Sequence, residues 1–266
     1  MNRTLDKLIA ILRRDLLTSI RHRTGFVLAL AALVIELAAF FYLSHAIGPG
    51  FRPDGLDYFP FLLVGTGLYT FFVMSTRAFL SSVEEAQQTG TMEVLMTTST
   101  SPTQLIVLSS ISAFAGSLAN LFIYILAGVA IFRATIHPNL LACLLVLALS
   151  LALATVLGIA AATFQISVQK GSALIWLLGS LLWFLSGTMF PVQSLPAPLA
   201  VLGRAIPFTS AIDGLRAALL EGRTVGSLVS TLAPLALFVL IALPLSLAGL
   251  SLSLRRARHS GTLSFY

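Results

Sequence analysis

Charged residues are scarce in this chain of 266 residues, and cysteine is almost absent. Charged residues make up 10% of the sequence and hydrophobic residues 57%, whereas about a quarter of a typical soluble domain is charged. This composition excludes an ordinary soluble domain and indicates an integral membrane protein. The one cysteine, Cys143, lies within an apolar run, so an intrachain disulfide is excluded and the thiol is expected to pack against its neighbours.

Lysine is also rare, since Lys7 and Lys170 are the only two. A P-loop needs a glycine-rich turn ending in Gly-Lys-Ser/Thr, whose N–H groups and lysine bind phosphates. Asp6 and Gln169 precede the two lysines, so ATP binding of that kind is excluded. The histidines lack metal-ligand spacing and no Gly-x-Ser-x-Gly motif is present. We therefore expect no enzyme activity, no bound metal and no cofactor on this chain.

Long apolar runs account for most of the sequence, and six of them are long enough to predict transmembrane helices. The expected fold is all-α, with spans at residues 24–46, 58–80, 104–132, 140–164, 171–190 and 229–254. Most of the 16 Lys and Arg residues fall on the side of the N-terminus, so both termini are predicted in the cytoplasm. Because the basic residues flank apolar runs, the net charge of +6 does not indicate nucleic-acid binding.

The two ends of the chain are predicted to lie outside the spans. Residues 1–23 carry one apolar stripe beside cationic residues, which is typical of an interfacial helix on the inner leaflet. A cytoplasmic helix packed on protein fits the same periodicity. Residues 255–266 begin with arginines and are expected to form a basic cytoplasmic tail.

A polar insert, residues 81–102, separates the second and third predicted spans. Ser82 and Glu85 have the spacing of a capping box, which predicts that a new helix begins at Ser82. Gly90 interrupts this helix at a cost of about 1 kcal/mol relative to alanine. Pro102 suits the first position of the next long helix. We expect a short, kinked, amphipathic helix across the cytoplasmic mouth of the bundle, suited to docking a partner.

A proline-rich segment, residues 191–223, separates the last two spans. Its apolar residues are too interrupted for a direct crossing, so we expect one or two short re-entrant helices, which protein or a water-filled cavity must surround. Gly222 suits a helix C-terminus. Asp213 and Arg216 are spaced i, i+3, and an ion pair between them is favoured.

Glu36 is the one acidic residue inside a predicted span. A charge there costs at least about 2.5 kcal/mol on insertion scales, so Glu36 should face the bundle interior or a cavity. It either contributes to a substrate pathway or acts as the structural partner of a polar group such as Asn120 or Gln165.

The polar insert and the proline-rich segment together resemble the permease subunits of ATP-binding-cassette (ABC) transporters of the type-2 exporter family. In the insert, the resemblance rests on Glu84, Glu85, Gly90, Thr91, Met92, Glu93, Ser101 and Pro102. In the proline-rich segment it rests on Phe190, Pro191, Leu195, Pro196, Pro207, Phe208, Thr209 and Arg216. The resemblance implies that the insert couples to an ATPase and that the second segment forms re-entrant helices at an external gate. Without it, a solvated acidic helix face is the simpler interpretation of the three glutamates.

The resemblance also implies partners and a location. Permeases of this family work as dimers with two cytoplasmic ABC ATPase subunits, which hold ATP and magnesium. It predicts a multi-pass protein of the prokaryotic inner membrane, in contact with lipids, that exports an amphiphile such as a drug, lipid or lipid-linked glycan. The second permease is expected to be another copy of this chain, with a related chain as the alternative.

Two other classes of protein remain open. A secondary transporter or channel working without ATP usually places several ionisable residues or broken helices near the midplane, often in internal repeats. Only Glu36 meets that description, and the two motifs are not repeated. A membrane scaffold without transport activity is the third class.

Overall fold

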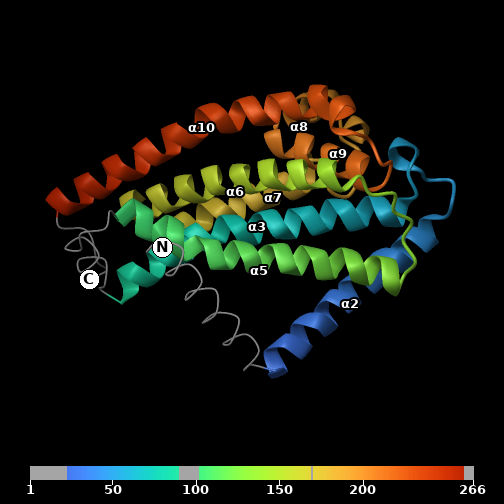
Figure 1. Ribbon diagram of the computed structural model, residues 1–266, viewed down its shortest axis with the longest axis horizontal. Coiled ribbons are helices and arrows are strands. Elements are labelled where there is room, and N and C mark those ends of the chain that lie inside the picture. Colours follow the sequence, from blue (N-terminus) through green and yellow to red (C-terminus); the bar gives the residue numbers. More distant parts are fainter. Residues whose placement is uncertain (1–22, 90–101, 169, 261–266) are drawn as a thin grey trace.

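The computed structural model describes residues 23–89, 102–168 and 170–260. Within these ranges every regular element is a helix (Figure 1). In chain order they are α2 (Arg23–Ile47), η1 (Pro53–Gly55), α3 (Tyr58–Gln88), α5 (Pro102–Ala130), α6 (Leu140–Val168), α7 (Gly171–Leu185), η2 (Val192–Ser194), α8 (Ala197–Ala205), α9 (Pro207–Leu219) and α10 (Val225–Ser260).

Four of the described helices are long and apolar enough to cross a membrane. They are Val27–Ile47, Tyr58–Gln88, Leu140–Val168 and Val225–Ala257. Shorter apolar helices are found at Phe114–Ala130, within α5, and at Gly171–Leu185, which is α7. The predicted all-α membrane fold is confirmed at this level, and the count of six spans stays a prediction.

Helix α7 is shorter than the predicted span at 171–190. It has 15 residues, which rise about 22 Å, less than the roughly 30 Å of a hydrocarbon core. The helix ends at Leu185 because Gly187 has a φ of +79°, a left-handed conformation that an α-helix does not continue. The chain then turns toward Phe190 and Pro191.

Helix α3 lies at the centre of the bundle. It packs chiefly against α5 and α6, and also contacts α2, α7 and α9. Its buried hydroxyls are satisfied locally or by a neighbouring helix. Thr66 donates to the carbonyl oxygen of Leu62 at 2.7 Å, and the Ser75 and Ser117 hydroxyls lie 2.7 Å apart between α3 and α5. These bonds allow polar residues inside an apolar bundle, where an unpaired hydroxyl would be costly.

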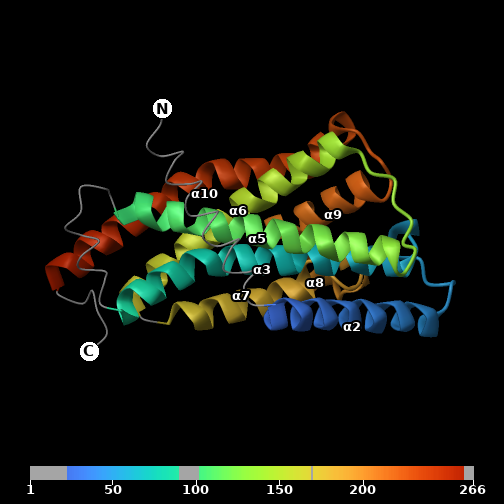
Figure 2. The same ribbon diagram turned by 60° about the horizontal axis from the view of Figure 1, so that its bottom comes forward.

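Helix α2 is the least enclosed part of the bundle. Only 11% of its apolar window is buried, against 78% for α3. Its contacts run through Leu33 and Leu37, which cluster with Phe59 and Leu63 of α3 and Tyr124 of α5. Its N-terminal part lies apart from the other helices in Figure 1, and Figure 2 shows α2 along one edge of the bundle. A broad apolar face of α2 is therefore left for lipid or another protein.

The bundle has two distinct ends. The C-terminal ends of α3 and α10 lie at one end, together with the start of α5 (Figure 1). Helices α8 and α9, η1 and the α5–α6 link lie at the other. The described residues on either side of the polar insert, at the end of α3 and the start of α5, therefore lie at the opposite end of the bundle from α8 and α9. The predicted N-terminal helix, residues 1–23, falls almost entirely outside the described residues.

Candidate functional site

A buried arginine on α9 joins three separate parts of the chain. The Arg216 side chain is 4% exposed. Its Nε and Nη2 donate to the carbonyl oxygen of Phe61 on α3 at 3.3 and 3.1 Å, and Nη2 also donates to the carbonyl oxygen of Thr188 at 3.0 Å. The guanidinium carbon lies 3.3 Å from the centroid of the Phe61 ring, a cation–π contact. One side chain thus holds α9, the start of α3 and the turn after α7 together.

The turn that meets Arg216 is built for close approach. Gly187 has a φ of +79°, and the Ser186 and Thr188 hydroxyls lie 3.0 Å apart. On the α3 side, a Cβ at Gly65 would collide with the Thr188 carbonyl oxygen and with Nη2 of Arg216. The absence of a side chain at residue 65 is therefore what allows this turn and the guanidinium to reach α3.

The predicted ion pair between Asp213 and Arg216 is wrong. No carboxylate of a described residue lies within ion-pair distance of Arg216, and Asp213 is exposed on the surface of α9. Asp213 and Asp54 act on the guanidinium only through longer-range Coulomb attraction. A guanidinium is planar and has five N–H groups to donate. In Arg216 these groups donate to backbone carbonyls from two separate segments, and not to a carboxylate on the same helix.

The other motif residues of the proline-rich segment shape the helices around this arginine. Phe208 is buried, and its ring centroid lies 4.5 Å from that of Phe72 on α3. Pro207 opens α9 and Pro196 precedes α8, where a missing N–H costs nothing. The ring of Phe190 meets Phe184 of α7 edge-on, with centroids 5.8 Å apart. Pro191 stands directly before η2.

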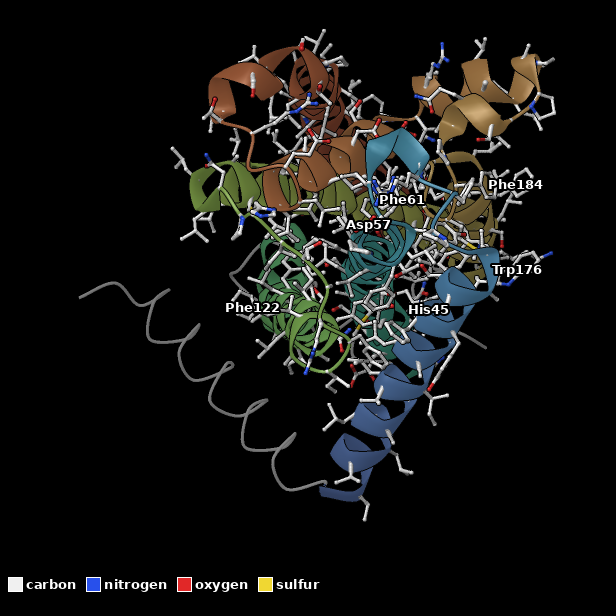
Figure 3. All side chains as sticks on the ribbon, turned by 90° about the vertical axis from the view of Figure 1, so that its right-hand side faces the viewer. His45, Asp57, Phe61, Phe122, Trp176 and Phe184 are labelled. Carbon is white, nitrogen blue, oxygen red and sulfur yellow. The ribbon has the colours of Figure 1, made fainter. Side chains whose placement is uncertain are left out.

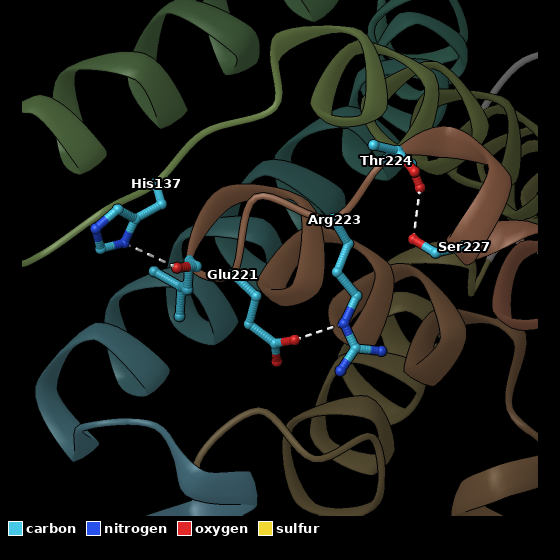
Figure 4. Close-up of polar contacts among 6 residues, drawn as sticks. His137, Glu221, Arg223, Thr224 and Ser227 are labelled. Atoms are coloured by element: carbon cyan, nitrogen blue, oxygen red, sulfur yellow. Dashed lines mark hydrogen bonds and ion pairs between the residues drawn. The ribbon is translucent and has the colours of Figure 1, made fainter.

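The link between α5 and α6 closes over the end of α9 (Figure 4). The backbone N–H groups of His137 and Asn139 donate to the carbonyl oxygens of Leu219 and Ala218, both at 2.9 Å. His137 Nδ1 donates to the carbonyl oxygen of Leu220 at 3.3 Å. These bonds satisfy carbonyls that a helix end otherwise leaves free. The expected glycine at this helix end is present, since Gly222 has a φ of +67°.

At the opposite end of the bundle, the predicted helix start at Ser82 is wrong. Helix α3 continues without a break to Gln88. The Ser82 hydroxyl donates back to the carbonyl oxygen of Ala78 at 3.0 Å, a bond typical of a serine inside a helix. Thr89 is the C-cap of the helix, and its N–H donates to the carbonyl oxygen of Glu85 at 2.9 Å. Glu84 and Glu85 therefore lie on the last turns of α3 itself.

Helix α3 is held at this end by a buried set of amides. Gln165 of α6 donates from Nε2 to Oε1 of Gln87 at 3.2 Å, and its own Oε1 accepts the N–H of Gly171 at 2.7 Å. Beside it, the Ser172 hydroxyl donates to Oε1 of Glu84 at 2.6 Å. The ends of α3 and α6 and the start of α7 are thus joined by side chains. Neither Gln87 nor Ser172 was predicted from the sequence, although polar residues at the margins of apolar runs suggest such pairing.

The rest of the predicted coupling loop lies outside the described residues. This applies to Gly90, Thr91, Met92 and Glu93. Pro102 is the first residue of α5, which is the position expected for it.

Glu36 on α2 faces a hydroxyl chain that crosses to α3. The Tyr124 hydroxyl lies 3.4 Å from Oε1 of Glu36 and 2.9 Å from the Thr66 hydroxyl. The expected partners, Asn120 and Gln165, do not contact it, since Gln165 belongs to the amide cluster and Asn120 lies near the sulfur of Met74 at 3.7 Å. The polar partner of Glu36 is therefore Tyr124, one helical turn after Asn120 on α5, and not either of the two residues named as examples.

Among the residues that the structure describes, no group of three His, Cys, Asp or Glu side chains is placed to hold a metal ion. Cys143 is buried and unpaired in α6. Several of the described buried polar residues form hydrogen bonds that join one helix to another.

Long apolar helices packed around α3, with short helices at one end, define a multi-pass helical membrane protein. Residues 27–248 match the ABC-2 family transporter proteins, and the chain belongs to that family. It is accordingly a permease, the membrane component of an ABC transporter, and the family associates with ABC ATPase subunits. No curated protein is similar enough to give a match.

Proposed function

We propose that this chain is the permease subunit of an ABC exporter in a prokaryotic inner membrane, with both termini in the cytoplasm. Two cytoplasmic ATPase subunits hydrolyse ATP and drive it, and a second permease completes the pathway as an identical or related chain. The cargo is an amphiphile, such as a drug, a lipid or a lipid-linked glycan. The proposal assigns no ATP site to this chain.

The continuity of α3 is the observation that carries this proposal. The helix has 31 residues and is about 46 Å long, so it extends beyond a hydrocarbon core of roughly 30 Å. One end bears Glu84 and Glu85, and the other meets Arg216 through Phe61. A movement imposed on the acidic end would be carried by one helix to the short helices α8 and α9.

The amide cluster supports the same role for α3. Because Gln87 and Gln165 are buried and hydrogen-bonded, the end of α3 cannot shift without moving α6 and α7 or breaking these bonds. A push from an ATPase would then reach three helices at once. Glu85 is exposed beside this cluster, where a basic residue of the partner can approach it.

The test compares charge reversals at the two ends of the bundle. Glu85→Lys should lower ATP-dependent transport and weaken recovery of a P-loop ATPase with the tagged permease from native membranes. Glu93→Lys should have the same effect. Glu221→Lys is the matched control, because it makes the same reversal at the end bearing α9, where Glu221 pairs with Arg223 at 2.6 Å.

Unchanged ATP-dependent transport in Glu85→Lys and Glu93→Lys would show that the coupling role is wrong. Transport driven by an ion gradient in liposomes containing this chain alone would favour a secondary transporter instead. Glu36, the acidic residue within α2, would then be the first candidate for an ion-binding group.

A further inference from the structure

A cavity of about 340 Å³ opens where α2 ends and the chain turns toward α3. Its lining includes His45 from the last turn of α2, Phe51 and Arg52 from the loop, and Asp57 and Tyr58 at the start of α3. Figure 3 looks onto this end of the bundle and shows His45 on α2 and Asp57 beside the start of α3. The cavity is near the lower limit for small-molecule sites, which run from about 300 to 1,000 Å³, so it suits a head group.

The cavity lies at the end of a candidate membrane span. The apolar span of α2 is Val27–Ile47, and the cavity begins at the last turn of that span. The outer face of α2 leads toward it and carries exposed large apolar side chains, among them Val27, Leu28, Ile35, Tyr42 and Leu43. A lipid whose head group entered the cavity would have an apolar helix face beside its acyl chains.

The charges in the cavity form one exposed pair of opposite sign. Arg52 Nη2 lies 3.2 Å from Oδ1 of Asp57, and the two side chains are 62% and 59% exposed. An ion pair this exposed contributes little to stability and opens easily. Asp57 occupies the N-cap of α3, yet its carboxylate caps no backbone N–H there. The carboxylate is therefore available to a ligand, unlike most N-cap aspartates.

The remaining lining residues are held in position. His45 Nδ1 donates to the carbonyl oxygen of Phe41 at 3.1 Å, and the two rings lie 4.3 Å apart between centroids. This leaves Nε2 as the ring nitrogen available to a ligand. Phe51 and Tyr58 form an edge-to-face pair with centroids 4.9 Å apart, which gives the cavity a rigid aromatic side.

We propose that this cavity binds the head group of a phosphoethanolamine lipid, with the phosphate on Arg52 and the ammonium on Asp57. Such a head group is neutral overall and carries a negative phosphate close to a positive ammonium. Arg52 and Asp57 are the complementary pair, a positive charge close to a negative one. Binding replaces the exposed Arg52–Asp57 ion pair by two charge-assisted hydrogen bonds, one between Arg52 and the phosphate and one between the ammonium and Asp57. An anionic head group would leave Asp57 opposed by a like charge, and choline has no N–H to donate to the carboxylate. The site requires that α2 end at a bilayer surface and is independent of the proposed coupling to an ATPase.

The test measures lipid retention by the full chain. The protein is purified in micelles containing equal amounts of phosphatidylethanolamine, phosphatidylcholine and phosphatidylglycerol with the same acyl chains, and the retained lipids are counted by native mass spectrometry. We expect the ethanolamine lipid to be enriched. Asp57→Asn and Arg52→Gln should each lower that enrichment about fivefold, the effect of losing one solvent-exposed charge contact.

Arg204→Gln is the matched control, since Arg204 is an exposed arginine on α8 and its loss should leave the enrichment unchanged. Thermal unfolding of each variant checks the fold. Soluble glycerophosphoethanolamine, added as a competitor, should displace the lipid only at high concentration if the acyl chains contribute. Equal retention of the three lipids by the unmodified chain would overturn the proposal, and so would enrichment that survives both substitutions.

Discussion

Two nitrogens of Arg216 donate to the single carbonyl oxygen of Phe61, and the same guanidinium lies over the Phe61 ring. This contact spans two helices separated by most of the sequence. It connects α9 to α3, the helix whose other end carries Glu84 and Glu85. This contact therefore fixes α9 to the start of α3 and to the turn after α7.

Replacing Arg216 with lysine should destabilise the protein. Lysine keeps the charge but cannot place several N–H groups in a plane toward the carbonyls of Phe61 and Thr188. We expect the free energy of unfolding to fall by about 1–3 kcal/mol, the range for charged hydrogen bonds lost in a buried site. Denaturation in micelles measures it. Arg223→Lys, at an exposed ion pair, should cost less than about 1 kcal/mol, and equal losses in the two variants would contradict the expectation.

Replacing Gly65 with alanine should lower the stability of the protein, whereas replacing Gly116 with alanine should raise it. Gly65→Ala forces its Cβ into the Thr188 carbonyl oxygen and the Arg216 side chain, and such overpacking costs about 1–3 kcal/mol. Gly116→Ala meets no atom within 4 Å and should stabilise α5 by up to about 1 kcal/mol, because alanine is the better helix former. Thermal unfolding of both variants side by side tests this. A Gly65→Ala variant as stable as the unmodified chain would show that the turn has room to move.

Gln165→Ala should loosen the joined ends of α3, α6 and α7. The substitution leaves Gln87 Oε1 and the N–H of Gly171 without their partner, and each unsatisfied buried group costs about 1–3 kcal/mol. We expect lower stability and faster hydrogen exchange at the Gly171 amide. Gln88→Ala, at an exposed residue one position from Gln87, is the control and should change neither. Unaltered exchange at Gly171 would mean that water replaces the glutamine.

A double-mutant cycle on Glu36→Gln and Tyr124→Phe should reveal coupling between α2 and α5. The Tyr124 hydroxyl lies between Glu36 and Thr66, and hydrogen bonds between membrane helices average about 0.6 kcal/mol, with a maximum near 1.7 kcal/mol. We expect an interaction energy in that range from unfolding measurements. Tyr42→Phe, on the exposed face of α2, should show none with Glu36→Gln. An interaction energy of zero for Tyr124 would leave Glu36 free for a role in the pathway.

Much of the helical layout was predictable from single residues. The apolar run that starts near residue 24 becomes α2, ending at Ile47, because a loop with Gly48 at a positive φ follows. Leu140 begins α6 as expected, directly after the Asn139 cap, whose side chain accepts the N–H of Ala142 at 3.1 Å. Capping and turn residues next to a helix decide where it begins and ends, so these helix termini can be predicted from the sequence.

The contacts that define the candidate site were not predictable in the same way. Ser82 and Glu85 have the spacing of a helix start, yet packing against α6 and α7 keeps α3 helical past them. Arg216 has an acidic residue one turn before it, yet its partners are backbone carbonyls from α3 and from the turn after α7. Carbonyl oxygens occur at every residue and leave no mark in the sequence.

The sequence by itself determined that this protein is a helical membrane protein, because apolar length and composition dictate what a bilayer accepts. Its place among the permeases came from the resemblance of its two motifs to a known family, which the match over residues 27–248 confirmed. Only the tertiary structure decided that α3 is one uninterrupted helix with an acidic end and an end bound by Arg216. It also decided that Glu36 faces Tyr124. The continuity of α3 and the contact between Glu36 and Tyr124 depend on which helices lie side by side. Van der Waals packing between whole helices determines that arrangement.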